Sequence, residues 1–512
     1  METIKSTKVK FKEYAQNQIM LIPPSLEEMI DKNHPVRIVN QVIDRIDIDP
    51  LFVKYKGGGT SSYHPRMLLK IVVFAYLSNI YSSRRMEAAC KENIHFMWIS
   101  GMNTPDHNTI NRFRSERLKG VLKQVFGKVV ELLVAQGLVN LKEIYLDGTK
   151  IESRANRYTF VWGNAIKANK ERIKKQLEEL WNYTQTIANE ELTDITPTSF
   201  DEIDSKKVTE TINKINEALK DKPISKKVNQ KLKYASKNWP DTLDRYDDQE
   251  KVLNGRNSYS KTDPDATFMR MKEDHMLNGQ LKPAYNWQIS TQDQFILNYS
   301  IHQNRTDTKT LSSHLQGFNK LYGQMPATVT ADAGYGSEQN YQFLAEQYIQ
   351  AFVKDNYFDK DQNGIDKKHP FIADKLYYNN EEDCYYCPMG QQMKRTGTST
   401  QTNYDGFKQS YACYQAQNCQ GCPLRGMCHE NTGNRVIKVN HQLRLLKAEA
   451  RALLLSEEGI KHRKKRPWDV EPVFGNIKYN KGFKRFMLSG CDKVEIEAGL
   501  LSIAHNLKKW SC

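Results

Sequence analysis

The spacing of apolar residues changes along this chain, and the change restricts the fold more than any other feature. Three segments repeat apolar residues three and four positions apart, as amphipathic helices do: 64–81, 83–100 and 106–138. Short apolar runs of strand length come later: 142–152, 284–293, 295–303 and 327–336. Helical segments follow these runs. We therefore expect an α/β domain with a mixed sheet, preceded by an all-α domain.

Two segments of different composition interrupt the strand pattern. Residues 161–260 are rich in Lys, Glu, Asn and Gln, whereas residues 355–437 contain six of the nine cysteines. We expect a helical insertion and a small Cys-rich insertion, in a chain whose length fits roughly three or four domains. We expect an N-terminal segment (1–60), a helical domain (61–140), a helical insertion (161–260) and a Cys-rich insertion (355–437). The core is expected to be divided into residues 141–160, 261–354 and 438–512.

The overall charge indicates a polyanionic partner. The 75 Lys and Arg residues exceed the 60 Asp and Glu residues and give a formal net charge of +15, which favours nucleic acid as the partner. The longest apolar run, residues 68–77, is too short to cross a bilayer. The first residues lack the apolar region of a signal peptide. We therefore expect a cytoplasmic protein without a membrane partner.

Two carboxylates each follow a short apolar run. Asp147 ends "EIYLD" and Asp332 ends "TVTAD", and each is followed by a glycine or another small residue. Adjacent strand ends bring such side chains together, and carboxylate oxygens are ligands that Mg²⁺ prefers. A pair of divalent ions about 4 Å apart supports phosphodiester chemistry. The spacing alone leaves open that Asp147 begins a turn and that Asp332 caps the next helix.

A basic segment near the C-terminus carries a third candidate ligand. Nine Lys and Arg residues lie from Lys461 to Arg485, with Glu471 in their midst. We expect a helix that begins near Pro467, a residue suited to a first helical turn. On that helix Lys478 lies two turns after Glu471, on the same face. The other basic side chains expected to line the DNA are Arg463, Lys464, Lys465, Arg466, Lys481, Lys484 and Arg485. A solvated surface position is the alternative for Glu471.

The N-terminal helices are a candidate DNA-binding module. Asp106 is a predicted N-cap, and the early turns after it carry Asn108, Asn111, Arg112 and Arg114. A compact helical region of this size is typical of a helix-turn-helix module, in which these side chains would face DNA. A plain helical bundle with a solvated face is the alternative that periodicity leaves open.

The cysteines of the insertion have the spacing of a metal site. Cys384-x2-Cys387 and Cys419-x2-Cys422-x5-Cys428 resemble thiolate zinc motifs, and Cys413 and His429 lie nearby. Thiols in the cytoplasm stay reduced. We expect four of these six cysteines to bind one structural Zn²⁺ in a segment with few apolar residues of its own. A DNA-contacting finger and an iron–sulfur cluster stay open as alternatives.

Three segments carry a family resemblance. "YLDGTKIESRANRYTFVWG", "VTADAGYGSEQNY" and "VEPVFGNIKYNKGFKRF" closely resemble those of bacterial insertion-sequence transposases with an RNase H-like DDE core, in the group numbered eleven eighty-two. The resemblance extends over nearly the whole chain and includes "HPVRIVN" and "PDHNTINRFR". It implies that Asp147, Asp332 and Glu471 bind two Mg²⁺ or Mn²⁺ ions. It also favours Cys387, Cys419, Cys422 and Cys428 as the zinc ligands.

The resemblance also implies an activity and partners. The expected protein is a Mg²⁺-dependent transposase of the bacterial nucleoid that binds the terminal inverted repeats of its element through the N-terminal helices. A homodimer would pair the two DNA ends, cut them and join them to target DNA. A non-catalytic, zinc-bearing DNA-binding regulator is the competing hypothesis, in which the three carboxylates only cap helices and keep the surface soluble.

One part of the basic segment departs from the family pattern. Many relatives carry a tyrosine and an arginine seven and four residues before the glutamate, where this chain has Lys464 and Pro467. The lysine seven residues after the glutamate is matched by Lys478. Trp468 has two predicted roles, stacking on a displaced base or packing in the core.

Overall fold

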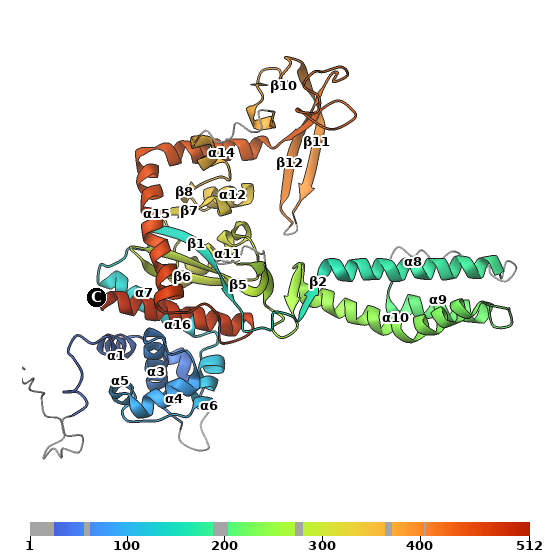
Figure 1. Cartoon of the computed structure of the whole chain (residues 1–512). Coiled ribbons are helices and arrows are strands. Elements are labelled where there is room, and N and C mark those ends of the chain that lie inside the picture. The colour runs from blue at the N-terminus through green and yellow to red at the C-terminus, as the bar shows by residue number, and fades with distance from the viewer. Residues whose placement is uncertain are drawn as a thin grey trace, which may run out of the picture.

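The computed structural model describes residues 25–55, 62–187, 203–271, 280–363, 371–403 and 406–511. A central sheet with its covering helices lies between an N-terminal helical domain and two insertions that project from it (Figure 1). The mixed α/β fold expected from the sequence is confirmed.

The N-terminal domain consists of six short helices: α1 (Pro35–Arg45), α2 (Asp49–Phe52), α3 (Pro65–Leu77), α4 (Ser83–Glu92), α5 (Ile94–Ile99) and α6 (His107–Arg112). α3 is apolar on nearly every side because α1, α4, α5 and the C-terminal helix α16 (Cys491–Trp510) surround it. The predicted N-cap is confirmed, since the Asp106 side chain accepts hydrogen bonds from the backbone N–H groups of Asn108 and Thr109. α1 packs against α3, so the helical domain includes residues that we assigned to an N-terminal segment.

The third helical segment is broken rather than continuous. A π-helical turn, η1 (Phe113–Arg117), follows α6, and α7 (Leu122–Ala135) begins only after a short loop. α7 packs against α16 and α11 (Leu311–Tyr322), so it covers the sheet instead of joining the N-terminal domain.

The central sheet has the strand order β4-β5-β1-β7-β8, and β6 pairs with β5. Its strands are β1 (Glu143–Glu152), β4 (Thr267–Arg270), β5 (Leu281–Gln292), β6 (Phe295–His302), β7 (Thr328–Ala331) and β8 (Gln350–Val353). β1 runs antiparallel to β5 and parallel to β7. Helices α7, α11, α12 (Glu338–Glu346), α15 (Glu457–Gly475) and α16 cover the sheet, and its strands are therefore almost wholly buried.

β1 is longer than the sequence indicated. We expected it to end at Asp147, but it continues to Glu152 because Gly148–Glu152 pair with β5. β7 accompanies only its first residues, Glu143–Tyr145. Beyond them, no strand among the described residues lies beside β1 on the β7 side, and Asp147 lies at this open edge.

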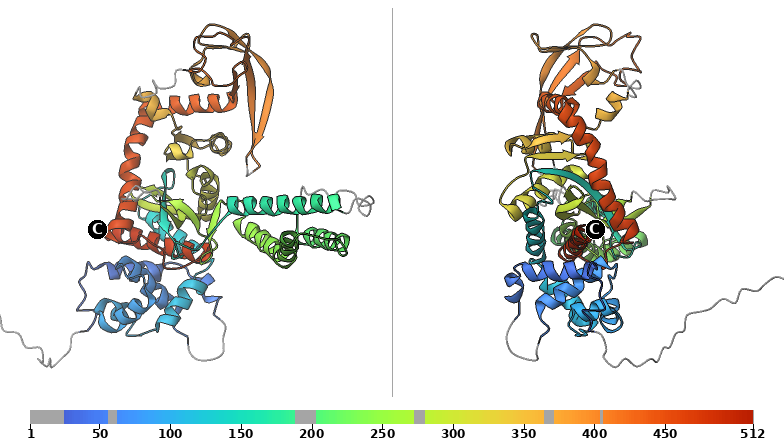
Figure 2. Two further views of the ribbon diagram at one scale, coloured as in Figure 1. Left: turned by 45° about the vertical axis from the view of Figure 1, so that its right-hand side comes forward. Right: turned by 90° about the vertical axis from the view of Figure 1, so that its left-hand side faces the viewer.

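Helices lie where we expected a helical insertion, and they share a core of their own. α8 (Gly163–Ile187), α9 (Ser205–Ala218) and α10 (Lys226–Leu253) enclose Leu177, Trp181, Ile212, Trp239 and Leu243. A two-stranded ribbon, β2 (Phe160–Trp162) and β3 (Ser258–Ser260), joins this arm to the central domain. Figure 1 and the left view of Figure 2 show the arm projecting away from the sheet.

The Cys-rich insertion folds as a small sheet rather than as loops alone. Its strands are β9 (Tyr378–Asn379), β10 (Cys384–Tyr386), β11 (Gln392–Thr402), β12 (Lys408–Ala416) and β13 (Val436–Val439). β11 and β12 form a long hairpin, and Tyr385, Met393 and Tyr414 lie in a separate hydrophobic cluster beside it. The insertion therefore has more apolar support than we expected from its sequence.

Two helices return the chain from this insertion to the core. α14 (His441–Leu455) is followed by α15 (Glu457–Gly475), which packs across β1, β5, β7 and β8. The predicted start of α15 near Pro467 is wrong. Ser456 caps the helix, and Pro467 lies in its interior. No helix among the described residues is long and apolar enough to cross a membrane.

Candidate active site

Asp147 lies in the middle of β1, where the neighbouring strand β7 has ended. Its side chain is only 11% exposed. One carboxylate oxygen, Oδ1, accepts a hydrogen bond of 2.8 Å from the Gly148 N–H and lies 3.2 Å from Nη2 of Arg466. The strand therefore fixes this carboxylate against a cation from α15.

Asp332 follows β7 directly and caps the short 3₁₀ turn η3 (Ala333–Tyr335). Its Oδ1 accepts a hydrogen bond of 2.8 Å from the Gly334 N–H, and its Oδ2 lies 3.5 Å from Arg466 Nη2. Asp332 thus caps this turn and not the next helix, α12, whose N-cap is Ser337, and its Oδ2 stays directed towards Arg466. The parallel pairing of β1 and β7 thus brings Asp147 and Asp332 to the same nitrogen atom.

Arg466 is the cation between the two aspartates. We expected it among the DNA-contacting residues, but its side chain is 16% exposed and its guanidinium faces the carboxylates. Its Nε is buried and has no hydrogen-bond partner among the described residues. One positive charge thus faces two negative charges. The donor set, two carboxylates directed at one point, fits a hard divalent cation.

Glu471 stands apart from this pair in the structure. It lies on α15, five residues after Arg466, and is exposed to solvent. Within the described ranges, no three His, Cys, Asp or Glu side chains are arranged closely enough to hold a metal ion. The fold therefore brings together two of the three predicted ligands and places the third on the helix that covers them.

The predicted relation between Glu471 and Lys478 is not observed. A π-helical turn, η6 (Asn476–Asn480), follows α15 and interrupts the α-helical spacing on which that prediction depended. Lys478 is 6% exposed, whereas Glu471 is exposed. The two side chains consequently face different surroundings.

A further carboxylate at this edge of the sheet was missed in the sequence. Asp307 begins the 3₁₀ turn η2 (Asp307–Lys309), between β6 and α11. A Cβ atom added at Gly148 would lie 2.8 Å from Asp307 Oδ1, and one added at Gly334 would lie 3.5 Å from Asp307 Oδ2. Asp307 therefore contacts the backbone beside both Asp147 and Asp332. The strand-like run 295–303 ends shortly before it, but no motif marks Asp307 itself.

The buried hydroxyl of Tyr335 is within electrostatic range of these three carboxylates. The residue is fully buried, and its hydroxyl donates a hydrogen bond to Oε1 of Gln288. Burial raises the pKa of Tyr335 well above its usual value, and the negative charges of Asp307, Asp147 and Asp332 raise this pKa further. Tyr335 therefore stays protonated and acts as a hydrogen-bond donor.

Other residues of the basic segment hold α15 in place. The buried carboxylate of Asp469 accepts hydrogen bonds from the N–H groups of Asp293 (2.8 Å) and Gln294 (3.2 Å) in the β5–β6 turn. Burial raises the pKa of Asp469. Lys465 pairs with Asp293 at 3.1 Å and lies 3.7 Å from Glu143. Lys465 is thus engaged by the protein itself.

The last basic residues divide into buried and exposed ones. Lys481 is buried, its Nζ donates to the backbone oxygen of Leu77 at 3.2 Å, and burial lowers its pKa to about 8. Lys464 and Lys484 are exposed. Trp468 is 76% exposed, which excludes packing in the core. The side chains available to a partner are therefore fewer than the sequence indicated.

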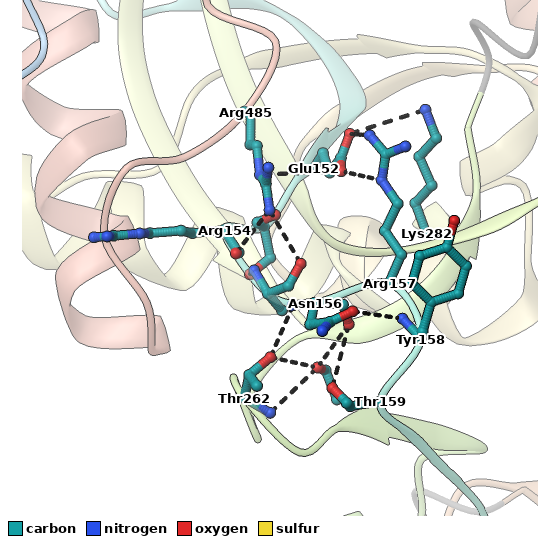
Figure 3. A network of polar contacts seen from close by, with 12 residues as sticks. Glu152, Arg154, Asn156, Arg157, Tyr158, Thr159, Thr262, Lys282 and Arg485 are labelled. Atoms are coloured by element: carbon teal, nitrogen blue, oxygen red, sulfur yellow. Dashed lines mark hydrogen bonds and ion pairs between the residues drawn. The ribbon is translucent and has the colours of Figure 1, made fainter.

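Arg485 organises the loop that follows β1. Its guanidinium donates hydrogen bonds of 2.9 and 2.7 Å to the backbone oxygens of Ser153 and Arg154 (Figure 3). It also lies 4.0 Å from Glu152, which pairs with Arg157 at 2.8 Å. This network supports the base of the helical insertion, a structural role that the sequence did not indicate.

The N-terminal candidates also divide by exposure. Asn108, Asn111 and Arg112 are exposed, as a DNA-binding surface requires. Arg114 is only 3% exposed and donates hydrogen bonds to the Tyr76 hydroxyl (3.1 Å) and to the Tyr81 backbone oxygen (2.6 Å). Arg114 therefore stabilises the interior of the domain and does not contact solvent in this structure.

Four cysteines of the insertion line one small cavity: Cys387, Cys419, Cys422 and Cys428. The cavity holds about 20 Å³, close to the volume that one water molecule needs. Cys384 in β10 and Cys413 in β12 do not line it. The eight described cysteines are free thiols, and Cys512 lies outside the described residues.

The surroundings of the cavity are rich in groups that bind sulfur or a metal. Arg435 Nη1 lies 2.8 Å from Cys428 Sγ, and the backbone N–H groups of Gln391 and Arg435 donate to Cys387 Sγ and Cys419 Sγ at 3.3 and 3.4 Å. Both ring nitrogens of His429 are buried, and no described residue satisfies them. These features fit a thiolate site, although the side chains as they lie do not meet the spacing of a bound ion.

Comparisons with known families give two matches. Residues 386–511 match the transposase DDE domain, and residues 24–116 match a transposase domain designated DUF772. The two matches support a DDE transposase. Such a domain implies activity of a nuclease or transferase type, a general need for a divalent metal, and DNA as the partner. No curated protein and no solved structure matches the chain.

The matched segments cover only part of the candidate site. The DDE match contains Glu471 and the exposed basic residues, and the second match covers the N-terminal helices, whereas Asp147 and Asp332 precede the DDE match. The geometry of the aspartate pair is therefore evidence that is independent of the matches.

Proposed function

We propose that this protein is a metal-dependent DNA transposase that cuts DNA at the ends of its element and joins those ends to target DNA. One observation carries the proposal. Asp147 and Asp332 come from adjacent parallel strands and face a single nitrogen, Arg466 Nη2, at 3.2 and 3.5 Å. Two carboxylates fixed by a sheet and directed at one cation are what a phosphodiester-cleaving metal site needs.

The proposed core is RNase H-like. Its support is the order of the sheet, in which β1 lies between an antiparallel neighbour, β5, and a parallel neighbour, β7. The first aspartate belongs to the central strand and the second to the end of its parallel neighbour. α15, with Glu471, crosses the same strands.

The proposed metal ligands are Asp147, Asp332 and Glu471. Two Mg²⁺ or Mn²⁺ ions held there would activate the attacking water or hydroxyl and neutralise charge on the phosphate. Geometry favours this assignment, because the two aspartates direct one oxygen each at the same position, which a cationic nitrogen occupies. Glu471 is exposed on α15, the helix that also carries Arg466, and its binding to the ions would require it to approach the aspartate pair.

DNA contacts are proposed at two surfaces. The N-terminal helices, with exposed Asn108, Asn111 and Arg112, would bind the terminal inverted repeats. Lys464, Trp468 and Lys484 would contact DNA beside the catalytic centre. Phosphate contacts of this kind weaken as salt rises. We further propose that a homodimer pairs the two ends, and that the protein belongs to the insertion-sequence group numbered eleven eighty-two and acts in the bacterial nucleoid.

A structural zinc site is proposed in the insertion, with Cys387, Cys419, Cys422 and Cys428 as ligands. Its support is that the same four thiols line one cavity, beside N–H donors to two of the sulfurs. Zinc bound by four cysteines would cross-link the loops at the base of the β11–β12 hairpin.

The catalytic proposal is tested by metal-dependent cleavage. The full-length protein is incubated with Mg²⁺ and DNA that carries both flanks of its own coding sequence, and nicking and strand joining are measured. Asp147→Asn and Asp332→Asn are expected to reduce nicking by on the order of 10³-fold, with DNA binding retained in a gel-shift assay. Glu471→Gln is expected to act in the same way.

The control variant is Asp248→Asn, which removes an exposed carboxylate from α10, remote from the sheet. It should nick DNA at the wild-type rate. Equal nicking by wild type and Asp147→Asn would contradict the proposal. Specific DNA binding by a wild-type protein that never nicks would favour the non-catalytic DNA-binding regulator.

A further inference from the structure

We propose that His429 is a positioning residue of the zinc site in the insertion, and that one of its ring N–H groups donates a hydrogen bond to the sulfur of Cys422. The inference rests on the proposed zinc site and deepens it, because it adds a fifth side chain to the four proposed ligands. His429 would act on the metal through Cys422 and would not bind it directly.

The unsatisfied ring of His429 is the first argument. Nδ1 and Nε2 are both buried, and neither has a hydrogen-bond partner among the described residues. A neutral imidazole carries one N–H donor and one acceptor, so a donor is buried without a partner in either tautomer. Such an unpaired donor is unfavourable. His429 lines the cysteine cavity, so its partner is to be sought among the other groups that line it.

The hydrogen bonds to the four sulfurs are the second argument. Backbone N–H groups donate to Cys387 Sγ at 3.3 Å and to Cys419 Sγ at 3.4 Å, and Arg435 Nη1 lies 2.8 Å from Cys428 Sγ. No N–H group in the described part of the chain donates to Cys422 Sγ. The cavity therefore contains one ring donor without an acceptor and one sulfur without a donor.

The other acceptors that line the cavity are less suitable partners. The side-chain oxygens of Gln391 and Asn418 already accept hydrogen bonds from the backbone N–H groups of Asn418 (3.1 Å) and Gln420 (2.8 Å). The thioether of Met389 is only a weak acceptor. A zinc-bound thiolate carries negative charge, and hydrogen bonds to charged acceptors are stronger than those to neutral ones. Cys422 is therefore the preferred partner of the ring.

Cys422 and His429 also lie in the same folded loop, between β12 and β13. The Arg425 N–H donates to the backbone oxygen of Cys422, and the Gly426 N–H donates to that of His429, both at 3.1 Å. Gly426 has a φ of +93°, a conformation that favours glycine. Arg425 Nη1 donates to the backbone oxygen of Cys419 at 3.2 Å. These contacts fold the loop onto itself and fix both residues at one wall of the cavity.

The proposed hydrogen bond would give each of the four sulfurs an N–H donor. Zinc bound by four thiolates carries net negative charge, which N–H donors directed at the sulfurs stabilise. Groups that hydrogen-bond to the ligands of a metal change its affinity by about 10- to 100-fold. His429 should therefore strengthen zinc binding and make the sulfur of Cys422 less reactive.

The test separates a hydrogen-bond donor from a side chain that only packs. The zinc affinity of the full-length protein is measured by competition with a chelator, in the variants His429→Phe and His429→Gln. Phe keeps a planar ring without nitrogens, whereas Gln keeps an N–H donor without a ring. The zinc affinity should fall about tenfold in His429→Phe and clearly less in His429→Gln. A packing role predicts the opposite order, which would overturn the inference.

His441→Phe is the matched control. His441 begins α14 in the same region of the chain, does not line the cavity, and lies 2.8 Å from the Tyr414 hydroxyl. Its replacement should leave the zinc affinity at the wild-type value, and an equal fall in both Phe variants would overturn the inference. If His429→Phe does not fold, His429→Leu replaces it, because Leu also lacks a donor and carries the same prediction.

A second measurement identifies the sulfur. The protein is treated with iodoacetamide at saturating zinc, and the labelled cysteines are assigned by mass spectrometry of its peptides. A thiolate without an N–H donor is the stronger nucleophile, so labelling of Cys422 relative to Cys387 should rise in His429→Phe. The same ratio in the wild type and in this variant would overturn the inference.

The outcomes distinguish this inference from the proposed zinc site. A folded wild type without zinc would overturn both. One zinc per chain, bound with equal affinity by the wild type and His429→Phe, would overturn the inference and leave the zinc site intact. Complete loss of zinc in both His429→Phe and His429→Gln would indicate direct ligation by His429, and it would also overturn the inference.

Discussion

The aspartate pair of the core and the cysteine cavity of the insertion are both candidate metal sites, but the chain builds them differently. Asp147 and Asp332 are distant in sequence and meet because β1 and β7 are neighbouring parallel strands. The four cysteines lie within residues 387–428 and meet where the β11–β12 hairpin brings the segments on either side of it together. A short spacing pattern can therefore predict a thiolate site, whereas the aspartate pair depends on the strand order of a whole sheet.

An arginine contacts the candidate ligands at each site, and the comparison shows what each arginine does. Arg466 lies 3.2 Å from Asp147, and Arg435 lies 2.8 Å from Cys428. Carboxylates carry their charge before any metal binds, whereas thiols become anionic when they bind one. Without a metal, the free energy of unfolding should depend on Arg466 at the core site. The cysteine cavity should instead lose the cross-link that zinc would form between its loops.

The largest expected effect is loss of zinc from the insertion. Purified protein should contain about one zinc per chain by elemental analysis, and Cys422→Ser should remove it. Structural zinc sites bind with roughly 10 kcal/mol or more of free energy near neutral pH. Because that energy supports the loops around the cavity, limited proteolysis should cut the zinc-free insertion while the central sheet resists.

Cys413→Ser is the matched control for this prediction. Cys413 lies in β12 and does not line the cavity, so its replacement should leave the zinc content unchanged. Equal zinc loss in both variants would contradict the proposed ligand set. A folded, protease-resistant wild type without any metal would contradict the zinc site altogether.

Arg466→Gln tests the electrostatic role at the core site and should have the second largest effect. It removes the guanidinium that faces Asp147, whose side chain is 11% exposed, and Asp332, whose side chain is 38% exposed, and the free energy of unfolding should fall by about 1–2 kcal/mol. Mg²⁺ should restore stability in this variant more than in the wild type, because the ion replaces the missing charge. Urea unfolding with and without Mg²⁺ measures both effects.

Lys464→Gln provides the control, since Lys464 is exposed on the same helix. Its stability should stay within about 0.5 kcal/mol of the wild type. An Arg466→Gln protein as stable as this control, and indifferent to Mg²⁺, would show that the aspartates do not form a cation site.

Part of the core site could be predicted from local sequence. The run "TVTAD" forms β7 with Asp332 at its end, because β-branched residues before a capping aspartate and a glycine define a strand and a turn. Asp106 could likewise be assigned as an N-cap from its position before a helical repeat. These features depend on contacts within a few residues.

The remaining features depend on tertiary contacts. Asp147 lies within a strand because β5 pairs with Gly148 and the residues beyond it. Pro467 is compatible with a first helical turn, yet Ser456 caps α15 much earlier and packing on the sheet maintains the helix through the proline. Arg114 is buried because a tyrosine hydroxyl and a backbone oxygen accept its hydrogen bonds. Asp307 has no local pattern, since only folding brings η2 beside η3.

Arg435→Gln should have the smallest effect and completes the comparison of the two arginines. Arg435 is buried and also donates to the backbone oxygen of Phe371, so the variant keeps part of its packing and loses the charge beside Cys428. Zinc bound by four thiolates carries net negative charge, which Arg435 would partly offset. The zinc affinity, measured by competition with a chelator, should fall about tenfold, or ~1.4 kcal/mol, and the stoichiometry should stay at one zinc ion per chain.

Mg²⁺ should not restore the zinc affinity of this variant, in contrast to its expected effect on the stability of Arg466→Gln. Unchanged zinc affinity would mean that Arg435 only packs against the cavity, and rescue by Mg²⁺ would mean that the two arginines do not belong to separate sites.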